Sequence, residues 1–202
     1  MTAIIFSGLI AYLLGSINTS IILSKLFGSD DIRKQGSGNA GATNTLRVLG
    51  KKAAVLVMIG DGLKGVLAVF FARWFSQLFS QGNISSYVAA VCVMLGHVFP
   101  VFFGFKGGKG IMTSIAVVFT LSPVIGAILV VTFVIIVALF NYISLASVVS
   151  SVCYPILVLV FFWGNIPFFV SALIMAAIAV LKHKSNIVRL LNGNEAKFIK
   201  KK

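Results

Sequence analysis

The 202-residue chain is 59% hydrophobic and 10% charged, and 17 Lys and Arg against 4 Asp and Glu give it a net charge of +13. A soluble domain usually carries about 25% charged residues, so the composition excludes a soluble enzyme and indicates a protein that spans the lipid bilayer. The cations concentrate in residues 28–52, 104–110 and 182–202. Because cytoplasmic loops of membrane proteins are enriched in Lys and Arg, we attribute this charge to topology and expect no nucleic-acid partner.

Three apolar runs in the first half come close to the ~20 residues that a spanning helix needs: Ala3–Leu26, Ala53–Phe75 and Tyr87–Phe103. The first run lacks a preceding basic segment and a small-residue cleavage site, so we expect a retained helix rather than a signal peptide. Two crossings separate the basic segments 28–52 and 104–110, which places both on one side of the membrane. The charge distribution predicts that this side is the cytoplasm.

The second half contains no charged residue from Ile111 to Leu181, and the basic tail after it should also be cytoplasmic. The run is interrupted where Pro, Gly or Asn ends helices: at Ser122-Pro123, Asn141-Tyr142 and Gly164-Asn165. We therefore predict an all-α integral membrane protein, a single domain over 1–202 with a compact bundle of about seven transmembrane helices, N-terminus outside and C-terminus cytoplasmic. Five spans is the alternative, if the first two breaks are kinks.

Two charged residues lie inside a predicted span, where charge is costly. Asp61 and Lys64 are three residues apart and share a helix face. Either they pair with each other, which is a structural role, or Asp61 orients a cation that binds substrate. Cys92 and Cys153 lie in apolar runs, and we interpret both as buried free thiols without chemistry.

The stretch GSGNAGATNTLRVLG, Gly36 to Gly50, is unusually polar for a segment between two spans. Its hydroxyl and amide groups can form hydrogen bonds, and the Arg47 guanidinium has the fork geometry that suits phosphate. Irregular backbone at membrane depth is tolerated where it is buried in protein or lines a wet cavity. We interpret this first motif as part of a polar pocket at the cytoplasmic face rather than as a linker.

A second polar motif is FKGGKG, Phe105 to Gly110. Backbone amides exposed by the glycines, the flanking Lys106 and Lys109, and a following helix N-terminus would form an anion site. The spacing of a Walker loop is missing. His97, in GHVFP, lies close to the same interface and is expected to be structural rather than catalytic.

The third motif is HKSNIVRLLNGNE, His183 to Glu195. His183 and Asn186 are three apart on a predicted helical turn, and His183 is either a general base or phosphate donor or a structural residue. Glu195 is expected to pair with a nearby cation. Cations, glycines and a histidine with few carboxylates favour a site for phosphorylated substrates and argue against metal-dependent phosphotransfer, so no metal site is predicted.

In this order the three motifs resemble those of the bacterial acyl-phosphate:glycerol-3-phosphate acyltransferases, the PlsY family, and YLLGSINTS and NYISLAS are similar to that family's pattern. The resemblance covers essentially the whole chain. It implies transfer of a fatty acyl group from acyl phosphate to the 1-hydroxyl of glycerol 3-phosphate, giving lysophosphatidic acid and phosphate. It further implies no cofactor or metal, a multi-pass protein of the bacterial cytoplasmic membrane with its active site on the cytoplasmic face, and the soluble acyl-phosphate-forming enzyme as a candidate partner.

The resemblance also implies the roles of individual residues. Those near the chemistry are Ser37, Arg47, His183 and Asn186; those that bind substrate are Asn39, Thr43, Asn44, Lys106, Gly107, Gly108, Lys109, Gly110 and Ser144. Glu195 is structural. Asp61 and Lys64 are also classed as structural, on their helical spacing rather than on the resemblance. The chain departs from the usual pattern at Asn18, where proline is common, and at Asn141, Lys184 and Asn194.

The mechanistic hypothesis is that the enzyme aligns the hydroxyl with the acyl carbonyl and stabilises the oxyanion. Arg47, Lys106 and His183 would hold phosphate, Ser37 would polarise the carbonyl, and the proton would pass to His183 or to a substrate phosphate. The His-x-x-x-x-Asp dyad of CoA-type acyltransferases is missing from the sequence. The alternatives are a transporter of organic phosphates and a membrane scaffold, but a transporter should place its polar groups near the midplane.

Overall fold

The computed structural model describes residues 1–80 and 82–199, which contain helices and turns and no β-strand. Internal contacts divide the chain into two compact units, Met1–Leu121 and Ser122–Lys202, here called the N-terminal and C-terminal units. The all-α prediction is confirmed, while the expectation of a single domain over 1–202 stays a prediction.

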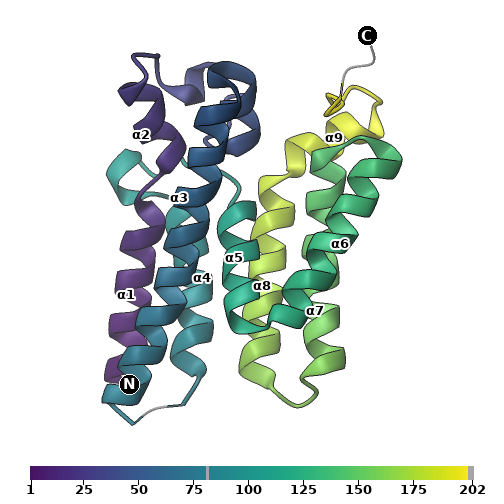
Figure 1. Cartoon of the computed structure of the whole chain (residues 1–202). Coiled ribbons are helices and arrows are strands. Elements are labelled where there is room, and N and C mark those ends of the chain that lie inside the picture. Colours follow the sequence, from purple (N-terminus) through teal and green to yellow (C-terminus); the bar gives the residue numbers. More distant parts are fainter. Residues whose placement is uncertain (81, 200–202) are drawn as a thin grey trace. The chain divides into compact units, whose positions relative to one another are not determined.

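The N-terminal unit consists of five α-helices and two short 3₁₀ turns (Figure 1), which are α1 (Thr2–Ser16), α2 (Thr19–Leu26), η1 (Ile32–Lys34), α3 (Ala42–Leu78), α4 (Ile84–Val98), η2 (Val101–Phe103) and α5 (Ile111–Leu121). Helix α1 packs against α3 and α4, and α5 packs against α3. A Cβ atom on Gly15 would lie 2.1 Å from the carbonyl oxygen of Val93. The backbones of α1 and α4 are therefore in direct contact, as small residues permit in membrane helices.

The predicted first span is broken where the family pattern has proline. Helix α1 ends at Ser16, and Asn18 caps α2 by accepting hydrogen bonds from the Ile21 amide (3.2 Å) and the Ser20 hydroxyl (2.9 Å). A buried cap thus marks the start of α2 at the position usually held by proline. The second predicted span is longer than expected, because α3 starts at Ala42 and continues through a kink at Gly50, whose φ is 83°.

The C-terminal unit consists of α6 (Pro123–Phe140), α7 (Ile143–Phe161), α8 (Ile166–Lys182) and α9 (Lys184–Leu191). Helix α7 packs against both α6 and α8. All three predicted breaks separate helices, so they are turns rather than kinks. Ser122 and Asn165 cap α6 and α8 by accepting from the amides three residues on, while Asn141 ends α6 in the left-handed conformation.

Asn141, where the family pattern often has a basic residue, also holds the end of the described chain. Its side chain exchanges two hydrogen bonds with the backbone of Ile199, each 2.8 Å long, and its carbonyl accepts from the Phe198 amide. A short backbone-like pairing thus fixes this segment beside the turn after α6. The tail cations at positions 200–202 lie outside the described residues.

Five helical segments among the described residues are long and apolar enough to cross a membrane: Thr2–Leu26, Ala42–Leu78, Ile84–Phe103, Pro123–Phe140 and Ile143–Phe161. A sixth is added if α8 and α9, bent by 58°, count as one span. Helix α5 has 11 residues and a length of about 16 Å, which is too short to cross a core of about 30 Å. The membrane architecture is confirmed with five or six supported spans, and the orientation of the termini stays a prediction.

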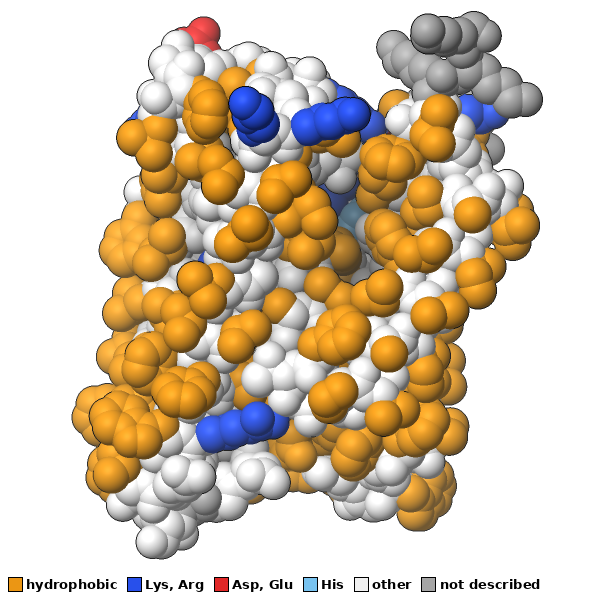
Figure 2. All heavy atoms as spheres, in the orientation of Figure 1, with side chains coloured by type: hydrophobic (Ala, Val, Ile, Leu, Met, Phe, Trp, Pro, Cys, Tyr) orange, Lys and Arg blue, Asp and Glu red, His pale blue; other side chains and the backbone are white. Residues whose placement is uncertain are grey.

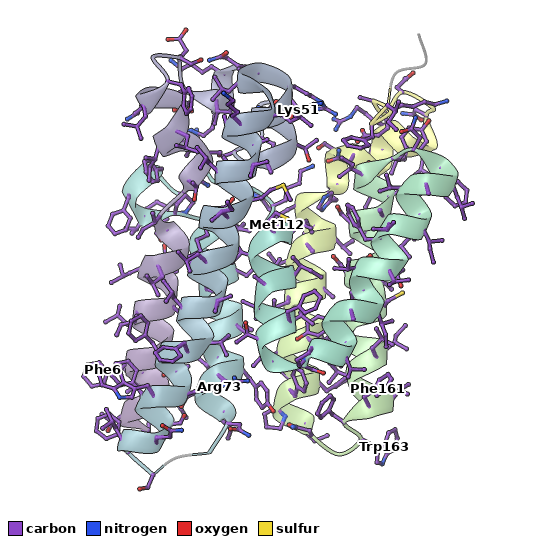
Figure 3. All side chains as sticks on the ribbon, viewed as in Figure 1. Phe6, Lys51, Arg73, Met112, Phe161 and Trp163 are labelled. Carbon is purple, nitrogen blue, oxygen red and sulfur yellow. The ribbon has the colours of Figure 1, made fainter. Side chains whose placement is uncertain are left out.

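The exposed surfaces of these helices are suited to lipid. Figure 2 shows hydrophobic side chains along the helices of the N-terminal unit, with Lys and Arg near the helix ends. Trp163 lies in the turn between α7 and α8 and is 82% exposed (Figure 3). Aromatic side chains at helix ends are typical of the boundary between lipid and water.

The contact between α1 and α4 yields a first prediction. Gly15→Ala should destabilise the protein by about 1–3 kcal/mol, because the new methyl group meets a backbone carbonyl, which cannot move aside as a flexible side chain could. The measurement is thermal unfolding of the purified protein in detergent.

The matched control for that measurement is Gly62→Ala, where the nearest heavy atom to the new Cβ would be 3.9 Å away. This change removes a helical glycine without a clash, so its unfolding midpoint should equal or exceed that of the wild type. Equal midpoints for the two variants would contradict the close α1–α4 contact.

Candidate functional site

The first motif divides into a loop and the start of α3. Residues 36–41 form the loop, with Gly36 and Gly38 at positive φ, and the helix begins at Ala42. More of the motif is helical than the interpretation as irregular backbone implied. Ala40 of the loop belongs to a small hydrophobic core with Ile21 and Ile32, against which Val48 and Phe103 pack.

Asn44 holds this loop in place. Its amide nitrogen donates to the carbonyls of Ile32 (3.1 Å) and Gln35 (2.9 Å), and its side-chain oxygen accepts from the Ser37 amide at 2.7 Å. Asn44 is almost fully buried, and both of its amide protons bind carbonyls of the segment just before the loop. These contacts favour a role in shaping the loop over direct contact with substrate.

The polar side chains of the first motif that reach the surface come from different places. Ser37 is exposed on the loop and Asn39 is half-buried. Thr43 and Arg47 are four residues apart on α3 and therefore share a face, with Arg47 exposed. This part of the unit presents hydroxyl, amide and guanidinium groups, all of which can bind an anion.

The glycine loop after α4 differs from the expectation of free backbone amides. The amides of Gly107 and Gly108 donate to the carbonyls of Val98 (3.1 Å) and His97 (3.2 Å) at the end of α4. A Cβ atom on Gly107 would lie 2.0 Å from the His97 carbonyl oxygen, and one on Gly108 would lie 2.2 Å from that of Ala40. The glycines thus permit close packing, and their amides are not available for an anion, which corrects the sequence-based interpretation.

The remaining parts of this loop support an anion site. Lys106 is exposed and Lys109 is half-buried. Gly110, at a φ of 80°, leads directly into α5. The N-terminus of a helix attracts negative charge. The two lysines and the start of α5 can therefore still bind an anion at this loop.

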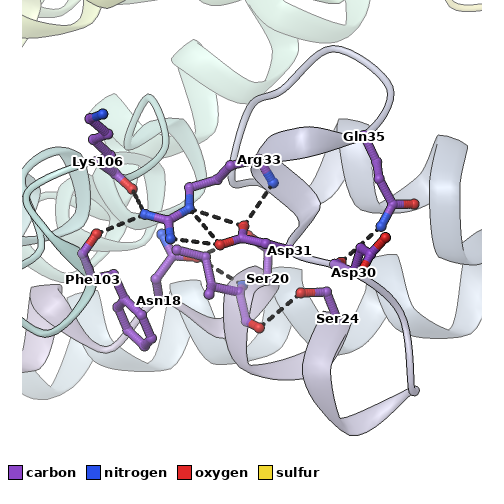
Figure 4. Close-up of polar contacts among 10 residues, drawn as sticks. Asn18, Ser20, Ser24, Asp30, Asp31, Arg33, Gln35, Phe103 and Lys106 are labelled. Atoms are coloured by element: carbon purple, nitrogen blue, oxygen red, sulfur yellow. Dashed lines mark hydrogen bonds and ion pairs between the residues drawn. The ribbon is translucent and has the colours of Figure 1, made fainter.

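Two residues that the sequence analysis did not single out, Asp31 and Arg33, join the segment just before the first motif to the glycine loop and the residue before Gly104 (Figure 4). Arg33 Nη1 donates to the carbonyls of Phe103 (2.7 Å) and Lys106 (2.9 Å), and its Nη2 pairs with Asp31 Oδ2 at 2.6 Å. The bonds from Arg33 hold the pKa of the Asp31 carboxyl below its usual value, and the same pairing raises the pKa of Arg33. The sequence signal that could have indicated this pair is an Asp two residues before an Arg in a chain with only four acidic residues.

Asp61, Lys64 and His97 form a buried charged cluster. Lys64 Nζ donates to Asp61 Oδ1 (2.8 Å), His97 Nδ1 (2.9 Å) and the carbonyl of Ile17 (2.9 Å), which uses all three of its protons. The three side chains are 1–5% exposed. The pairing of Asp61 with Lys64 is therefore confirmed.

His97 links this cluster to the glycine loop. An ammonium group only donates hydrogen bonds, so its bond to Nδ1 leaves the proton of a neutral ring on Nε2. A Cβ atom on Gly108 would lie 2.3 Å from that Nε2, which places the ring directly against the loop. The buried His97 ring thus packs against the glycine loop, in agreement with its expected structural role.

In the C-terminal unit the third motif surrounds Glu195. Glu195 accepts hydrogen bonds from Asn186 Nδ2 (2.6 Å) and Arg189 Nε (2.7 Å). Burial alone would raise the pKa of the Glu195 carboxyl, but the hydrogen bonds from Asn186 and Arg189 outweigh it and hold the pKa below its usual value. The expected pairing of Glu195 with a cation is confirmed by Arg189, and the carboxylate also fixes the side chain of Asn186.

His183 occupies the junction between α8 and α9 and is only 3% exposed. Its Nδ1 lies 2.7 Å from the carbonyl oxygen of Ala179, which can accept a hydrogen bond but cannot donate one. The ring proton of neutral His183 is therefore on Nδ1, and Nε2 is the basic nitrogen. An open groove beside it is lined by Leu181, Lys182, Lys184, Ser185 and Val188.

Three comparisons with known proteins agree with these motifs. A family model described as glycerol-3-phosphate acyltransferase matches residues 5–193. A glycerol-3-phosphate acyltransferase of Thermoanaerobacter pseudethanolicus is 46% identical over 193 residues, 96% of this chain and 94% of the relative. Two crystal structures of PlsY (YgiH), an integral membrane glycerol 3-phosphate acyltransferase, are each 38% identical to it. The glycerol 3-phosphate form has a TM-score of 0.88 and the lysophosphatidic acid form 0.85, covering 98% of this chain and 96% and 95% of theirs.

The helices and polar motifs thus define a membrane-embedded acyltransferase. The chain belongs to the glycerol-3-phosphate acyltransferase family, and within it to the PlsY group. The resemblance found in the sequence motifs is confirmed.

The buried charged cluster yields a second prediction. Lys64→Met should destabilise the protein by about 3–5 kcal/mol, because it leaves the Asp61 carboxylate buried without its cation. Thermal unfolding in detergent measures the loss. The double variant Asp61→Asn with Lys64→Met removes both charges and should recover part of it. A double variant less stable than Lys64→Met alone would show that the two charges do not depend on each other.

Glu195 yields a prediction on pH. Because its pKa is lowered in the folded protein, its contribution to stability is complete above its ordinary value of 4.5 and is lost as pH falls through the lowered pKa. At neutral pH Glu195→Gln should lower stability by about 1–3 kcal/mol. Unfolding midpoints of both proteins across pH should converge only on the acid side. A constant difference at every pH would contradict the role of the carboxylate charge.

Proposed function

We propose that this protein transfers a fatty acyl group from acyl phosphate to the 1-hydroxyl of glycerol 3-phosphate, which gives lysophosphatidic acid and inorganic phosphate. The observation that carries the proposal is the match of the whole chain to a glycerol 3-phosphate acyltransferase crystallised in its glycerol 3-phosphate and lysophosphatidic acid forms. Acyl phosphate as the donor rests on the resemblance of the three motifs to that family. The soluble enzyme that makes acyl phosphate is the proposed partner.

The N-terminal unit provides groups for a phosphorylated substrate. Arg47 and Lys106 are exposed cations, and charge-assisted hydrogen bonds to phosphate are stronger than neutral ones. Lys109, Asn39 and Thr43 add donors at half-buried positions. In this proposal Gly107, Gly108 and Gly110 shape the loop that carries the lysines, and Asn44 shapes the loop that carries Ser37.

The C-terminal unit provides groups for proton transfer and for holding the substrate. Nδ1 of His183 is bound to the Ala179 carbonyl, so Nε2 can accept a proton, or donate one to phosphate when the ring is charged. Asn186 is oriented by Glu195, and Ser144 lies at the start of α7. These residues are the proposed catalytic and substrate-binding groups of this unit.

The reaction needs little from the protein beyond alignment and electrostatics, because acyl phosphate is already activated. The 1-hydroxyl oxygen bonds to the acyl carbon, the bond from that carbon to the phosphate oxygen breaks, and phosphate leaves. Ser37 is proposed to donate to the carbonyl oxygen as its negative charge develops. The hydroxyl proton passes either to His183 or to a phosphate oxygen of a substrate, and the pH dependence of kcat in the His183 variant distinguishes the two.

The basic segments 28–52, 104–110 and 182–202 support the proposal that the site lies at the cytoplasmic face of the membrane. Each substrate of the proposed reaction carries a charged phosphate group that is soluble in water. The acyl chain of the donor and the product is soluble in lipid. A site at the membrane surface therefore suits both halves of the reaction.

The experiment that tests the function uses the purified protein in lipid nanodiscs with palmitoyl phosphate, radiolabelled glycerol 3-phosphate and a metal chelator. A parallel reaction contains palmitoyl-CoA as the only donor. We expect labelled lysophosphatidic acid with palmitoyl phosphate alone. Product with palmitoyl-CoA alone would overturn the donor, and no product from either would overturn the proposed function.

Two substitutions test the proposed roles. His183→Ala should lower kcat by about 10²–10⁴-fold if the ring transfers a proton, and Lys106→Ala should raise the KM for glycerol 3-phosphate by about tenfold or more. The matched control is Lys34→Ala, which removes an exposed lysine in η1. The measurement is kcat and KM of each variant, restricted to variants that insert into the membrane and elute from gel filtration like the wild type. Wild-type constants for both variants would exclude these residues from the site.

A further inference from the structure

The turn between η2 and the glycine loop has an unusual backbone. Gly104 and Phe105 are both in the left-handed region, with φ of 66° and 58°. Glycine adopts this conformation freely, whereas a bulky side chain does so at a cost. Phe105 is 57% exposed, so burial of its ring does not account for the conformation. The turn must be held by contacts made to its backbone.

Arg33 makes those contacts. Its Nη1 donates to the carbonyl of Phe103 at 2.7 Å and to that of Lys106 at 2.9 Å, the two residues that flank the left-handed pair. Figure 4 shows the guanidinium between these carbonyls. One nitrogen thus bridges both ends of the turn, while the Phe105 amide is bound to the Pro100 carbonyl at 2.9 Å.

Asp31 fixes the direction of the guanidinium. Its carboxylate accepts from Nε of Arg33 at 3.0 Å, from Nη2 at 2.6 Å and from the Arg33 amide at 2.9 Å. Because Nε and Nη2 are occupied on one edge, Nη1 is directed to the turn. Both side chains are less than one third exposed, which shields the pair from competing water.

We propose that Arg33, oriented by Asp31, is a positioning residue for glycerol 3-phosphate that acts through the turn at 103–106. The side chain of Lys106 extends from the residue whose carbonyl Arg33 binds. Without that bond the left-handed pair can relax, and the lysine no longer points in a fixed direction. This inference rests on the proposed function, and it adds two residues that make no contact with the reacting atoms.

The test compares Arg33→Gln with the wild type in nanodiscs, using glycerol 3-phosphate and palmitoyl phosphate. The KM for glycerol 3-phosphate should rise by about tenfold or more, because bonds from a charged donor are lost, while kcat and the KM for palmitoyl phosphate stay near wild type. Arg33→Lys keeps the charge but not the fork and should have an intermediate KM. Asp31→Asn, a milder change to the same contact, should move the KM in the same direction.

The matched control is Arg73→Gln. Arg73 also donates from Nη2 to a backbone carbonyl, that of Thr120, at 2.6 Å, and it lies at the opposite end of α3 from Lys51 (Figure 3). Its removal should leave both KM values unchanged. An equal rise in the KM for glycerol 3-phosphate in this control would show a general loss of structure and would overturn the positioning role.

A double-mutant cycle separates positioning from stability. Asparagine adopts the left-handed conformation more readily than phenylalanine, so Arg33→Gln should raise the KM less in a Phe105→Asn background than in the wild type. The same rise in both backgrounds, or a loss of kcat with no change in the KM for glycerol 3-phosphate, would overturn the inference alone. A wild type without acyltransferase activity would overturn the proposed function and this inference with it.

Discussion

The structure depends on one constraint, which is that backbone polar groups in hydrocarbon must form hydrogen bonds within the protein. Helices satisfy this requirement along their length but leave carbonyls unpaired at their C-terminal ends. In this chain the glycine loop supplies the missing donors at the end of α4, since the amides of Gly107 and Gly108 bind the carbonyls of Val98 and His97. The loop that carries the two lysines is therefore also the cap of a membrane helix.

The same constraint explains the buried charges. The break between α1 and α2 leaves the carbonyl of Ile17 inside the protein, and Lys64 of α3 reaches it across the helix interface. Asp61 compensates the charge of that lysine, and His97 of α4 accepts its third hydrogen bond. Two helices, α3 and α4, and the break between α1 and α2 thus meet at one ammonium group. A buried charge of this kind requires full satisfaction of its donors, and here the cluster also positions the ring that supports Gly108.

The sequence predicted the features that depend on local pattern. The membrane class followed from composition, and the turns at Ser122-Pro123, Asn141 and Gly164-Asn165 followed from helix-breaking residues. The pairing of Asp61 with Lys64 was one of the two alternatives that helical spacing allowed. Ordered motifs were sufficient to indicate the family. The residues of the candidate site were proposed from those motifs, and their roles in the reaction stay predictions.

Features that depend on distant contacts were not predictable in this way. The Arg33 side chain binds carbonyls about seventy positions away in the chain, and no local spacing encodes such a contact. Glycine in a basic loop suggested free amides, but the amides are used because the loop packs against α4. Hydropathy marks α5 as apolar without revealing that it is too short to cross.

The contact between α1 and α4 has a consequence for lipid selectivity. Because a single methyl group at Gly15 or Gly96 would collide with the opposite backbone, the seam between these helices cannot admit a hydrocarbon chain. A substrate tail must therefore lie against another surface of the protein. Residues that determine which chain lengths are accepted should be sought on faces where the helices are separated by larger side chains.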